Sequence, residues 1–390
     1  MSGTETHGSG SEREQRAAKA ARLRELGVVP YAYRFERTCT IAEAVAREAE
    51  LVTAGTPVSL AGRIMALRGH GHTSFAHVKD ASGKMQIYVR DDEITERDFE
   101  IFRLLDVGDI VGVTGPLFRT KTGELTIRVK GFEVLAKAMR PLPEKWHGLQ
   151  DKELRYRRRY VDLIVNDDVF ATFVARSRIV EAVRRFLLSK GFLEVETPVL
   201  QPIYGGALAR PFVTHHNALD VDLYLRIADE LYLKRLIVGG MERVFEFSKD
   251  FRNEGMDRSH NPEFTMLECY AAYWDYTDMM NFVEELFGTL AREIAGGPEI
   301  RYGEHTINLA PPWRRLAYYE GLREATGRDL READAAALKK IAEERGLEIE
   351  GASSRGDFLD LLFGGLVEPG LIQPTFVMDY PIELSPLAKR

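Results

Sequence analysis

Charged and aromatic residues alternate between positions 243 and 270, and this stretch carries the clearest signal for chemistry. Read with a period of two, its first half places phenylalanines on one face and polar side chains on the other. The polar side chains are those of Glu246, Ser248, Asp250, Arg252 and Glu254. A polar loop containing glycine and proline follows, and then the alternation resumes. The second half places on one face Phe264, Met266, Glu268 and Tyr270. The pattern predicts a hairpin with a functional polar face, and an amphipathic hairpin with one solvated face is the simpler alternative.

Two carboxylates, Glu230 and Glu268, stand in stretches that are otherwise apolar. Tyr270 lies on the same predicted face as Glu268. A carboxylate that is buried needs a cation close to it. That cation is either a ligand or an arginine of the protein itself, and the spacing leaves both open.

The composition excludes several classes of protein. The chain has 390 residues, of which 45% are hydrophobic and 29% charged, as is typical of a globular protein with two or three domains. It has no run of about 18 uncharged apolar residues, so we expect no membrane span. Its polar N-terminus lacks the apolar core of a signal peptide. Cys39 and Cys269 are isolated, which argues against a zinc site or a disulfide framework and favours a cytoplasmic protein.

The distribution of charge is more informative than its sum. The net charge of −7 argues weakly against a nucleic-acid partner. However, basic residues gather between Arg13 and Arg37 and between Lys137 and Arg159. Basic patches on an acidic protein are typical of an enzyme that binds a large polyanion, although solvated helix faces and a linker explain them equally well.

Short strands separated by turn sequences fill residues 56–135. Five such strands, with a helix predicted over residues 95–105, match a small barrel of the OB type. Barrels of this type bind single-stranded nucleic acid on an exposed strand face. Phe75 on the second strand and Gln86 on the third are candidates to stack on and hydrogen-bond an unpaired base. A place for Phe75 in the barrel core fits the pattern equally well.

We therefore expect an α+β multidomain protein in which a β-barrel precedes a larger domain of strands and helices. The predicted segments are a mobile tail (1–12), an N-terminal helical segment (13–55), the OB-fold domain (56–140), a linker (141–165) and a second domain (166–390) with a helical insert at about 332–363.

From about Glu14 to Arg390 the chain resembles the class II aminoacyl-tRNA synthetases, and within them the bacterial-type lysyl-tRNA synthetases. The stretches that carry the resemblance include GFLEVETP, FRNEGMDRSHNPEFTMLECY and DYPIELSPLAKR. The first, with the helix before it, is similar to the family's motif 1, which forms the dimer interface, and the hairpin is similar to motif 2. The resemblance implies a homodimer, with an OB-fold anticodon-binding domain followed by the class II antiparallel sheet flanked by helices.

The activity that the resemblance implies is ATP-dependent activation of L-lysine to lysyl-adenylate and transfer of the lysine to tRNA(Lys). The amino-acid carboxylate is already ionised, so catalysis rests on positioning and on charge stabilisation. Arg252 is the expected catalytic residue, because its planar fork can bridge the α-phosphate and the carboxylate. Mg²⁺ bound to the phosphates would relieve their charge. The implied ATP-binding residues are Arg252, Glu254, His260, Asn261 and Phe264, the last stacking on the adenine.

The same resemblance supplies a ligand for the two carboxylates. The ammonium group of lysine would be met by Glu268 and Tyr270, while Glu230 would face the α-amino end. Gly206 would let the backbone approach that end closely. Relatives that activate aspartate or asparagine would want a cation in this pocket, and none is evident in the sequence.

Two features depart from the family's pattern. Ser259 stands where the family commonly has arginine before the loop histidine, with Arg258 one place earlier. No stretch matches the third motif, G-x-G-x-G-x-D-R, and the acidic metal ligands before it would lie beyond Arg390. The chain therefore resembles an enzyme cut after SPLAKR. A non-catalytic tRNA-binding and dimerising fragment is the alternative, whereas a lysyl-transferase acting on a protein is disfavoured, because such relatives lack the barrel.

Overall fold

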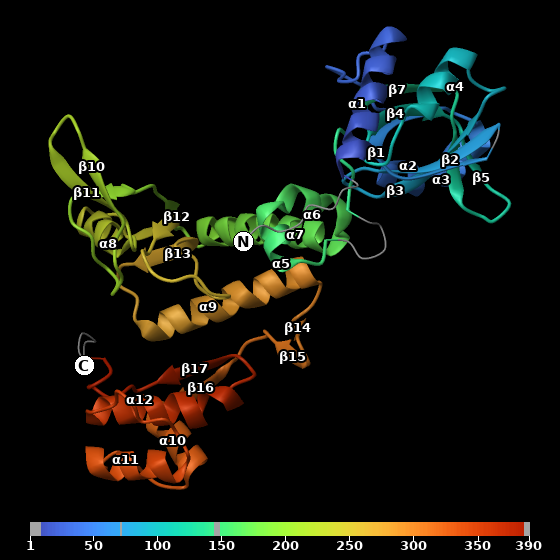
Figure 1. The fold of residues 1–390 in the computed structure, drawn as a ribbon. Helices are drawn as coiled ribbons and strands as arrows, with labels where there is room; N and C mark the ends of the chain where they lie inside the picture. The colour runs from blue at the N-terminus through green and yellow to red at the C-terminus, as the bar shows by residue number, and fades with distance from the viewer. Residues whose placement is uncertain (1–8, 71, 144–148, 386–390) are drawn as a thin grey trace. The chain divides into compact units, whose positions relative to one another are not determined.

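The structure of the chain, a computed structural model, describes residues 9–70, 72–143 and 149–385. It divides into two compact units, Met1–Phe170 and Ala171–Arg390 (Figure 1). Most of the predicted tail, the middle of the predicted linker and most of the SPLAKR stretch lie outside the described residues. Among the helices that are described, none combines the length and the apolar character needed to cross a membrane.

The first unit combines one large sheet with short helices. Its helices are α1 (Ser9–Glu25), α2 (Ile41–Ala46), α3 (Glu48–Ala54), α4 (Glu96–Arg103), α5 (Lys152–Arg157) and α6 (Arg159–Val165). Its strands are β1 (Val58–His70), β2 (Thr73–Lys79), β3 (Lys84–Arg90), β4 (Ile110–Gly115), β5 (Leu117–Arg119), β6 (Leu125–Arg128) and β7 (Gly131–Ala136).

Within the described residues the strands of this unit form one sheet in the order β5-β6-β3-β2-β1-β4-β7. Seven strands stand where five are predicted, because two of the predicted strands are divided. Pro116, which has no backbone N–H for a sheet ladder, separates β4 from β5. After Arg128 the chain changes partner, so that β6 pairs with β3 and β5 while β7 pairs with β4. The helix predicted between the third and fourth strands is α4, and the Thr95 side chain caps its N-terminus.

The interior of the barrel is apolar. Leu60, Ile64, Ile87, Val113 and Ile127 are among its buried residues. Phe75 lies outside this core and is half-buried. The barrel therefore leaves the Phe75 ring available at its surface.

Helices occupy parts of the segments predicted as tail and linker. α1 begins at Ser9, and α5 and α6 lie within residues 152–165. The Asp162 carboxylate, which is buried, pairs with Arg155 and Arg159 and holds the turn between α5 and α6. The domain boundaries stated above stay predictions.

The helices that follow are α7 (Asp167–Ser189), which runs from the first unit into the second, α8 (Glu230–Val238), α9 (Tyr276–Leu290), the π-helical turn η1 (Ala291–Ala295), α10 (Tyr318–Thr326), α11 (Ala335–Glu344), α12 (Arg355–Leu366) and the 3₁₀ turn η2 (Glu368–Gly370). The strands are β8 (Leu193–Glu194), β9 (Leu200–Gln201), β10 (Val213–His216), β11 (Val221–Leu225), β12 (Arg243–Phe251), β13 (Glu263–Ala271), β14 (Glu299–Tyr302), β15 (His305–Asn308), β16 (Arg314–Ala317) and β17 (Thr375–Met378).

The predicted hairpin is β12 and β13, and it is the longest strand pair of the second unit. β8 joins it in parallel beside β12, and β10, β11 and β9 form a separate sheet. Figure 1 shows α9 running alongside the hairpin. Phe186 and Leu187 of α7, Phe245 of β12, and Phe282 and Leu286 of α9 share one core. This core fixes the apolar face of the hairpin.

The predicted helical insert contains α11 and α12. Asp334 caps α11, and Ser354 forms a capping box with Asp357 at the start of α12. Both helices pack with α10 around a core that includes Leu338 and Leu362. β16 and β17 pair in parallel beside it, so residues 314–384 carry their own hydrophobic centre.

Candidate active site

The register of the hairpin brings the predicted polar residues of its two strands onto one face. Glu246 lies opposite Glu268, and Asp250 lies opposite Phe264. Directly opposed residues of an antiparallel pair point to the same side of the sheet. The other side, with Phe245 and Phe247, is the apolar face that packs on the core. The alternation read from the sequence therefore assigns the two faces correctly.

The polar face of β12 is not solvated, and this corrects the simpler alternative. Glu246, Ser248 and Asp250 are exposed by only 3%, 2% and 0%. The cause is Arg226, a buried arginine that precedes α8. Its guanidinium lies 2.7 Å from Glu246, 3.2 Å from Asp229 and 3.3 Å from Asp250.

Glu246 is the best satisfied of these carboxylates. It receives the 2.7 Å hydrogen bond from Arg226 and further hydrogen bonds from the backbone N–H and the hydroxyl of Thr197. Arg226 also donates to the backbone carbonyls of Thr197 and Lys249. The guanidinium is thus largely committed to Glu246 and to the backbone.

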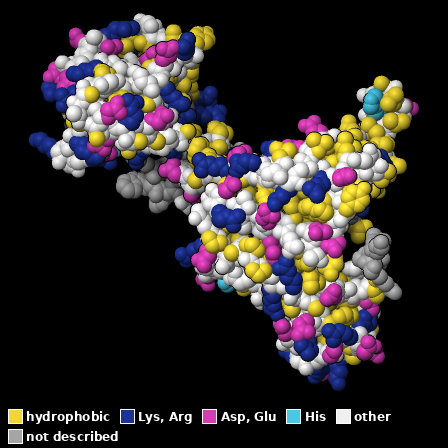
Figure 2. Space-filling model, turned by 180° about the vertical axis from the view of Figure 1, so that it is seen from behind, with side chains coloured by type: hydrophobic (Ala, Val, Ile, Leu, Met, Phe, Trp, Pro, Cys, Tyr) yellow, Lys and Arg dark blue, Asp and Glu magenta, His cyan; other side chains and the backbone are white. Residues whose placement is uncertain are grey.

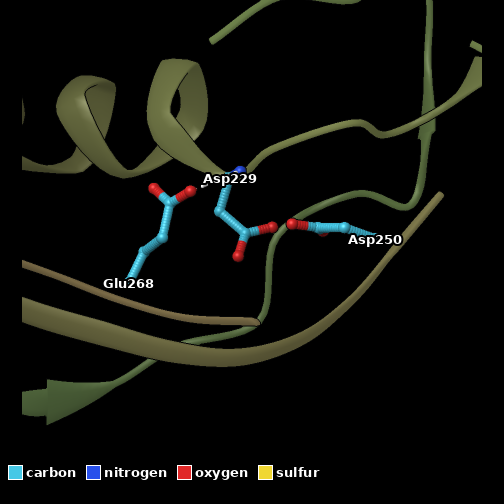
Figure 3. Close-up of side chains that lie close together, drawn as sticks. All are labelled: Asp229, Asp250 and Glu268. Carbon is cyan, nitrogen blue, oxygen red and sulfur yellow. Dashed lines mark hydrogen bonds between the residues drawn. The ribbon is translucent and has the colours of Figure 1, made fainter. Parts of the chain in front are cut away.

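Asp229, Asp250 and Glu268 form an acidic cluster in the second unit (Figure 3). Each offers one carboxylate oxygen, and these oxygens lie within 4.8 Å of one another, close enough to surround a small cation. Figure 3 shows the Asp229 and Asp250 carboxylates pointing toward each other, with Glu268 beside Asp229. Both aspartates are fully buried, and within the part of the chain that the structure describes, neither oxygen of Asp229 nor Oδ2 of Asp250 has a well-formed hydrogen bond.

Burial changes the acidity of this cluster. It raises the pKa of the Asp229 carboxyl from its ordinary value of 3.8 to about 7, and the neighbouring Asp250 carboxylate adds to the effect. Burial likewise raises the pKa of the Asp250 carboxyl, and Arg226 opposes that rise. A buried carboxyl without a donor or a full counter-charge keeps its proton to a higher pH.

Glu268 and Tyr270 are brought together as predicted. The Tyr270 hydroxyl donates to Glu268 Oε2 at 3.1 Å, and the backbone N–H of Asp229 lies 3.4 Å from Glu268 Oε1. Burial, together with the charge of Glu268, raises the pKa of Tyr270, and burial raises the pKa of the Cys269 thiol to about 11. Among the ion pairs of the described residues, none joins Glu268 to a lysine or an arginine, so these residues supply no arginine partner for this carboxylate.

Gly206 and Glu230 are also neighbours. Gly206 has a φ of +88°, and a Cβ placed there would lie 3.0 Å from Cβ of Glu230. The position therefore favours glycine both for its backbone and for its space. The Glu230 carboxylate, at the start of α8, pairs with Lys234 at 2.6 Å across one helical turn. Lys234 is thus the partner of Glu230 when no ligand is present.

The residues predicted to bind ATP lie at the open end of the hairpin. Arg252 is half-buried, its guanidinium lies 5.0 Å above the Phe264 ring, and its Nε lies 3.4 Å from the Ile227 carbonyl. Glu254, His260 and Asn261 are exposed. The structure thus brings Arg252 and Phe264 into contact, whereas the other three belong to the loop.

One aspartate organises this loop. Asp257 accepts hydrogen bonds from the backbone N–H groups of Ser259 and His260, and its other oxygen lies 2.7 Å from Nδ1 of His260. Asn261 donates to the Glu263 carbonyl at 2.5 Å. His260 is therefore held at the loop surface by a local turn rather than by the hairpin.

In the barrel, Phe75 and Gln86 line one pocket of about 440 Å³. The other residues that line it are Ala66, Arg68, His77, Thr120, Lys121 and Thr122. Gln86 donates to Glu124 and accepts from Thr126, both at 2.9 Å, and the Phe75 ring packs 4.9 Å from that of Tyr88. An aromatic face, an anchored amide and two cationic side chains are the parts of a site for an unpaired base.

The sequence reasoning missed Asp229, Arg226 and the barrel cations Arg68 and Lys121. Asp229 precedes a helix, and no periodicity ties it to Asp250 on a strand. Arg68 and Phe75 lie directly opposite each other in the antiparallel pair β1–β2, so the pairing of these two strands was the available signal.

The fold and the arrangement of the hairpin define a class. Residues 151–390 match the family of class II tRNA synthetases (D, K and N), and residues 58–135 match the OB-fold nucleic-acid-binding domain found with anticodon recognition. The chain belongs to the class II aminoacyl-tRNA synthetases of this D, K and N family, which confirms the predicted order of barrel and catalytic domain.

Curated relatives that match the chain include three lysine--tRNA ligases. The lysine--tRNA ligase of Carboxydothermus hydrogenoformans is 54% identical over 376 residues, which cover 96% of this chain and 77% of the relative. That of Pelotomaculum thermopropionicum is 53% identical over 378 residues, covering 96% and 74%. That of Bacillus subtilis is 48% identical over 381 residues, covering 96% and 76%.

Proposed function

We propose that the protein activates L-lysine with ATP and transfers it to tRNA(Lys). The observation that carries this proposal is Glu268, a half-buried carboxylate that the Tyr270 hydroxyl orients and that no lysine or arginine of the described chain neutralises. A side-chain ammonium supplies the missing charge, whereas the side chains of aspartate and asparagine do not. The names of the curated relatives agree with this choice.

In the activation step, the chain's own residues position and stabilise charge. The lysine carboxylate attacks the α-phosphorus of ATP and pyrophosphate leaves, so no protein nucleophile is required. Arg252 would bridge the two anions while it stacks on Phe264, and the Phe264 ring would also stack on the adenine. Glu230 would accept a hydrogen bond from the α-amino group of lysine. Glu230 would then exchange its contact with Lys234 for one with the substrate.

The metal ion that we propose for the reaction is Mg²⁺ that is bound to ATP. The exposed loop of Glu254 and His260 offers no group of three acids or histidines among the described residues. The acidic cluster includes Glu268, where we propose that the lysine ammonium binds. Mg²⁺ would bind phosphate oxygens of ATP, where it would offset their negative charge.

For tRNA, we propose that the Phe75 pocket holds an anticodon base. Stacking on the ring would supply affinity, and the amide of Gln86 would read the base edge. Arg68 and Lys121 would neutralise the neighbouring phosphates.

The proposed assembly is a cytoplasmic homodimer. Hydrophobic side chains gather on the face of the second unit that Figure 2 shows. Exposed apolar residues on α7 and in the segment after it are Ile179, Leu188, Leu193, Val199, Leu200 and Ile203. This segment contains the GFLEVETP stretch, and an isologous contact would cover these side chains.

Amino-acid-dependent exchange of pyrophosphate with ATP tests the proposal, because the family includes three specificities. We expect exchange with L-lysine and none with L-aspartate or L-asparagine at equal concentration. Exchange that depends on either of the other two amino acids would contradict the assignment.

A further inference from the structure

The buried carboxylates carry more negative charge than Arg226 balances. Glu246 and the acidic cluster (Asp229, Asp250 and Glu268) are four carboxylates, and Arg226 is the cation of the described chain that pairs with members of this group. Three negative charges would remain before lysine binds, and burial of unpaired charge is costly. A proton held by the carboxylates lowers this cost, and a bound ammonium would take over that role.

The hydrogen bonds show which of the four carboxylates lack partners for their negative charge. Glu246 is satisfied by Arg226 and Thr197, and Glu268 by Tyr270 and the Asp229 N–H. Asp229 and Asp250 are left facing each other. Arg226 lies 3.2 Å from Asp229 and 3.3 Å from Asp250, and the Ser248 hydroxyl lies 3.2 Å from Asp250 Oδ1, but among the described residues these groups leave both oxygens of Asp229 and Oδ2 of Asp250 without a well-formed hydrogen bond. Two carboxylates in such a position share a proton.

We propose that Asp229 and Asp250 form a proton-sharing pair behind Glu268 and that the side-chain ammonium of lysine expels the shared proton when it binds. This inference rests on the proposed function and extends it, because it adds two residues that determine the selection of a fully charged side chain. On binding, one carboxyl O–H bond breaks, its proton passes to the buffer, and the electron pair stays on the carboxylate that then faces the ammonium.

The charges around Asp229 and Asp250 support the release of the shared proton when lysine binds. The charged groups that act on the pair are Arg226 before α8, Glu246 on β12 and Glu268 on β13, and the Tyr270 hydroxyl is bonded to Glu268. Arg226 favours ionisation of the pair, while Glu246 and Glu268 oppose it. Adding a cation beside Glu268 shifts that balance toward ionisation. A neutral amino-acid side chain would leave the proton in place and gain none of this attraction.

Calorimetric titration of L-lysine at pH 6.5, in two buffers with different ionisation enthalpies, measures the protons released. We expect release approaching about one proton per lysine bound, because the free pair is protonated at this pH. In Asp250→Asn and in Asp229→Asn the release should be lost. Asp329→Asn, which removes an exposed carboxylate paired with Arg331, is the matched control and should release protons like the unmodified protein.

Four outcomes overturn the inference. Saturable lysine binding without proton release in the unmodified protein, or release that persists in both aspartate variants, leaves the lysine assignment intact and removes the proton-sharing pair. Release that changes after treatment with EDTA shows a metal ion between the carboxylates instead. Absence of saturable lysine binding contradicts the proposed function together with this inference.

Discussion

The Tyr270 hydroxyl donates a hydrogen bond to Glu268 Oε2 at 3.1 Å, and this contact fixes the direction of the carboxylate. Burial and the charge of Glu268 raise the pKa of Tyr270, so its hydroxyl keeps the proton that it donates and leaves the other carboxylate oxygen for a ligand. The backbone N–H of Asp229 lies 3.4 Å from that second oxygen. Glu268 is thus oriented by neutral donors, and its charge is left for the substrate.

Asp229→Asn should change the pH dependence of stability. The folded protein keeps the Asp229 proton up to about pH 7, whereas an unfolded aspartate releases it near 3.8. Between these values the folded state binds more protons, so the free energy of unfolding falls as the pH rises and levels off above about pH 7. Asparagine has no proton to lose in this range, so the free energy of unfolding should not fall as the pH rises. Its side chain also offers an N–H to Asp250. We therefore expect the variant to be more stable than the unmodified protein at pH 8 by at least about 1 kcal/mol. Urea unfolding at pH 5 and pH 8 measures it.

The matched control for that experiment is Asp329→Asn, because the pKa of the Asp329 carboxyl is shifted in the opposite direction from that of Asp229. The backbone N–H of Arg331 holds the pKa of the exposed Asp329 carboxyl below its usual range, so any stability it contributes is present above an unfolded pKa of 3.8 and is lost on acidification. Asp329→Asn should leave the fall in stability between pH 4 and pH 7 unchanged. If the free energy of unfolding of Asp229→Asn depended on pH in the same way as that of the unmodified protein, Asp229 would be ionised in the folded state over this whole pH range.

Gly206→Ala should weaken lysine binding. Alanine would occupy a φ of +88° and place its Cβ 3.0 Å from Cβ of Glu230 and 3.1 Å from Cβ of Ala228. Relief of that contact moves Glu230, and we expect an affinity for lysine at least roughly tenfold lower, equivalent to about 1.4 kcal/mol. Gly240→Ala is the control, because its φ is +96° but its Cβ would meet nothing within 4 Å. Gly240→Ala should lose stability alone, and equal effects of the two variants on lysine affinity would argue against a local contact.

Arg252→Lys should slow amino-acid activation while it keeps the positive charge. Lysine lacks the planar fork that spans two anions and stacks on the Phe264 ring. We expect kcat for ATP–pyrophosphate exchange to fall by roughly tenfold or more. Arg243→Lys, at the start of β12 and stacked on Trp274, should affect stability without changing kcat. A normal kcat for Arg252→Lys would mean that charge alone is sufficient at this position.

Phe75→Ala should weaken tRNA binding and leave adenylate formation unchanged. Stacking of a base on an aromatic ring contributes about 1–3 kcal/mol, so we expect a loss of at least roughly fivefold in tRNA affinity. Phe75→Trp should retain binding, because it keeps the stacking face. Tyr33→Ala removes a fully exposed aromatic ring of the same unit outside the pocket and serves as the control. Filter binding measures all three, and equal affinity of Phe75→Ala and Tyr33→Ala would contradict the anticodon site.

The sequence predicts the hairpin and its faces because the alternation of Phe245, Glu246 and Phe247 directly reports which side is apolar. It also predicts Phe75 and Gln86 as candidates for one base on neighbouring strands, and the two residues line the same pocket. Their functional roles stay predictions, as do those of the ATP and lysine residues. The family resemblance, in contrast, is confirmed by the matches over residues 58–135 and 151–390.

The burial of Glu246 and Asp250 was not predictable from periodicity. A strand face rich in carboxylates is normally exposed, and here it is covered because Arg226 inserts its guanidinium among them. The position of Asp229 depends on how the start of α8 docks on the hairpin. Such contacts arise from tertiary packing between segments more than 15 residues apart, and no local pattern encodes them.

The most direct test of the central claim is the KM for L-lysine of Glu268→Gln in ATP–pyrophosphate exchange. Glutamine keeps the shape and the contact with Tyr270 but removes the charge that the ammonium needs. We expect KM to rise at least tenfold, which corresponds to about 1.4 kcal/mol or more. Glu263→Gln, an exposed position on the same strand, should leave KM unchanged. A KM for Glu268→Gln equal to that of the unmodified protein would contradict the assignment of Glu268 to the lysine ammonium.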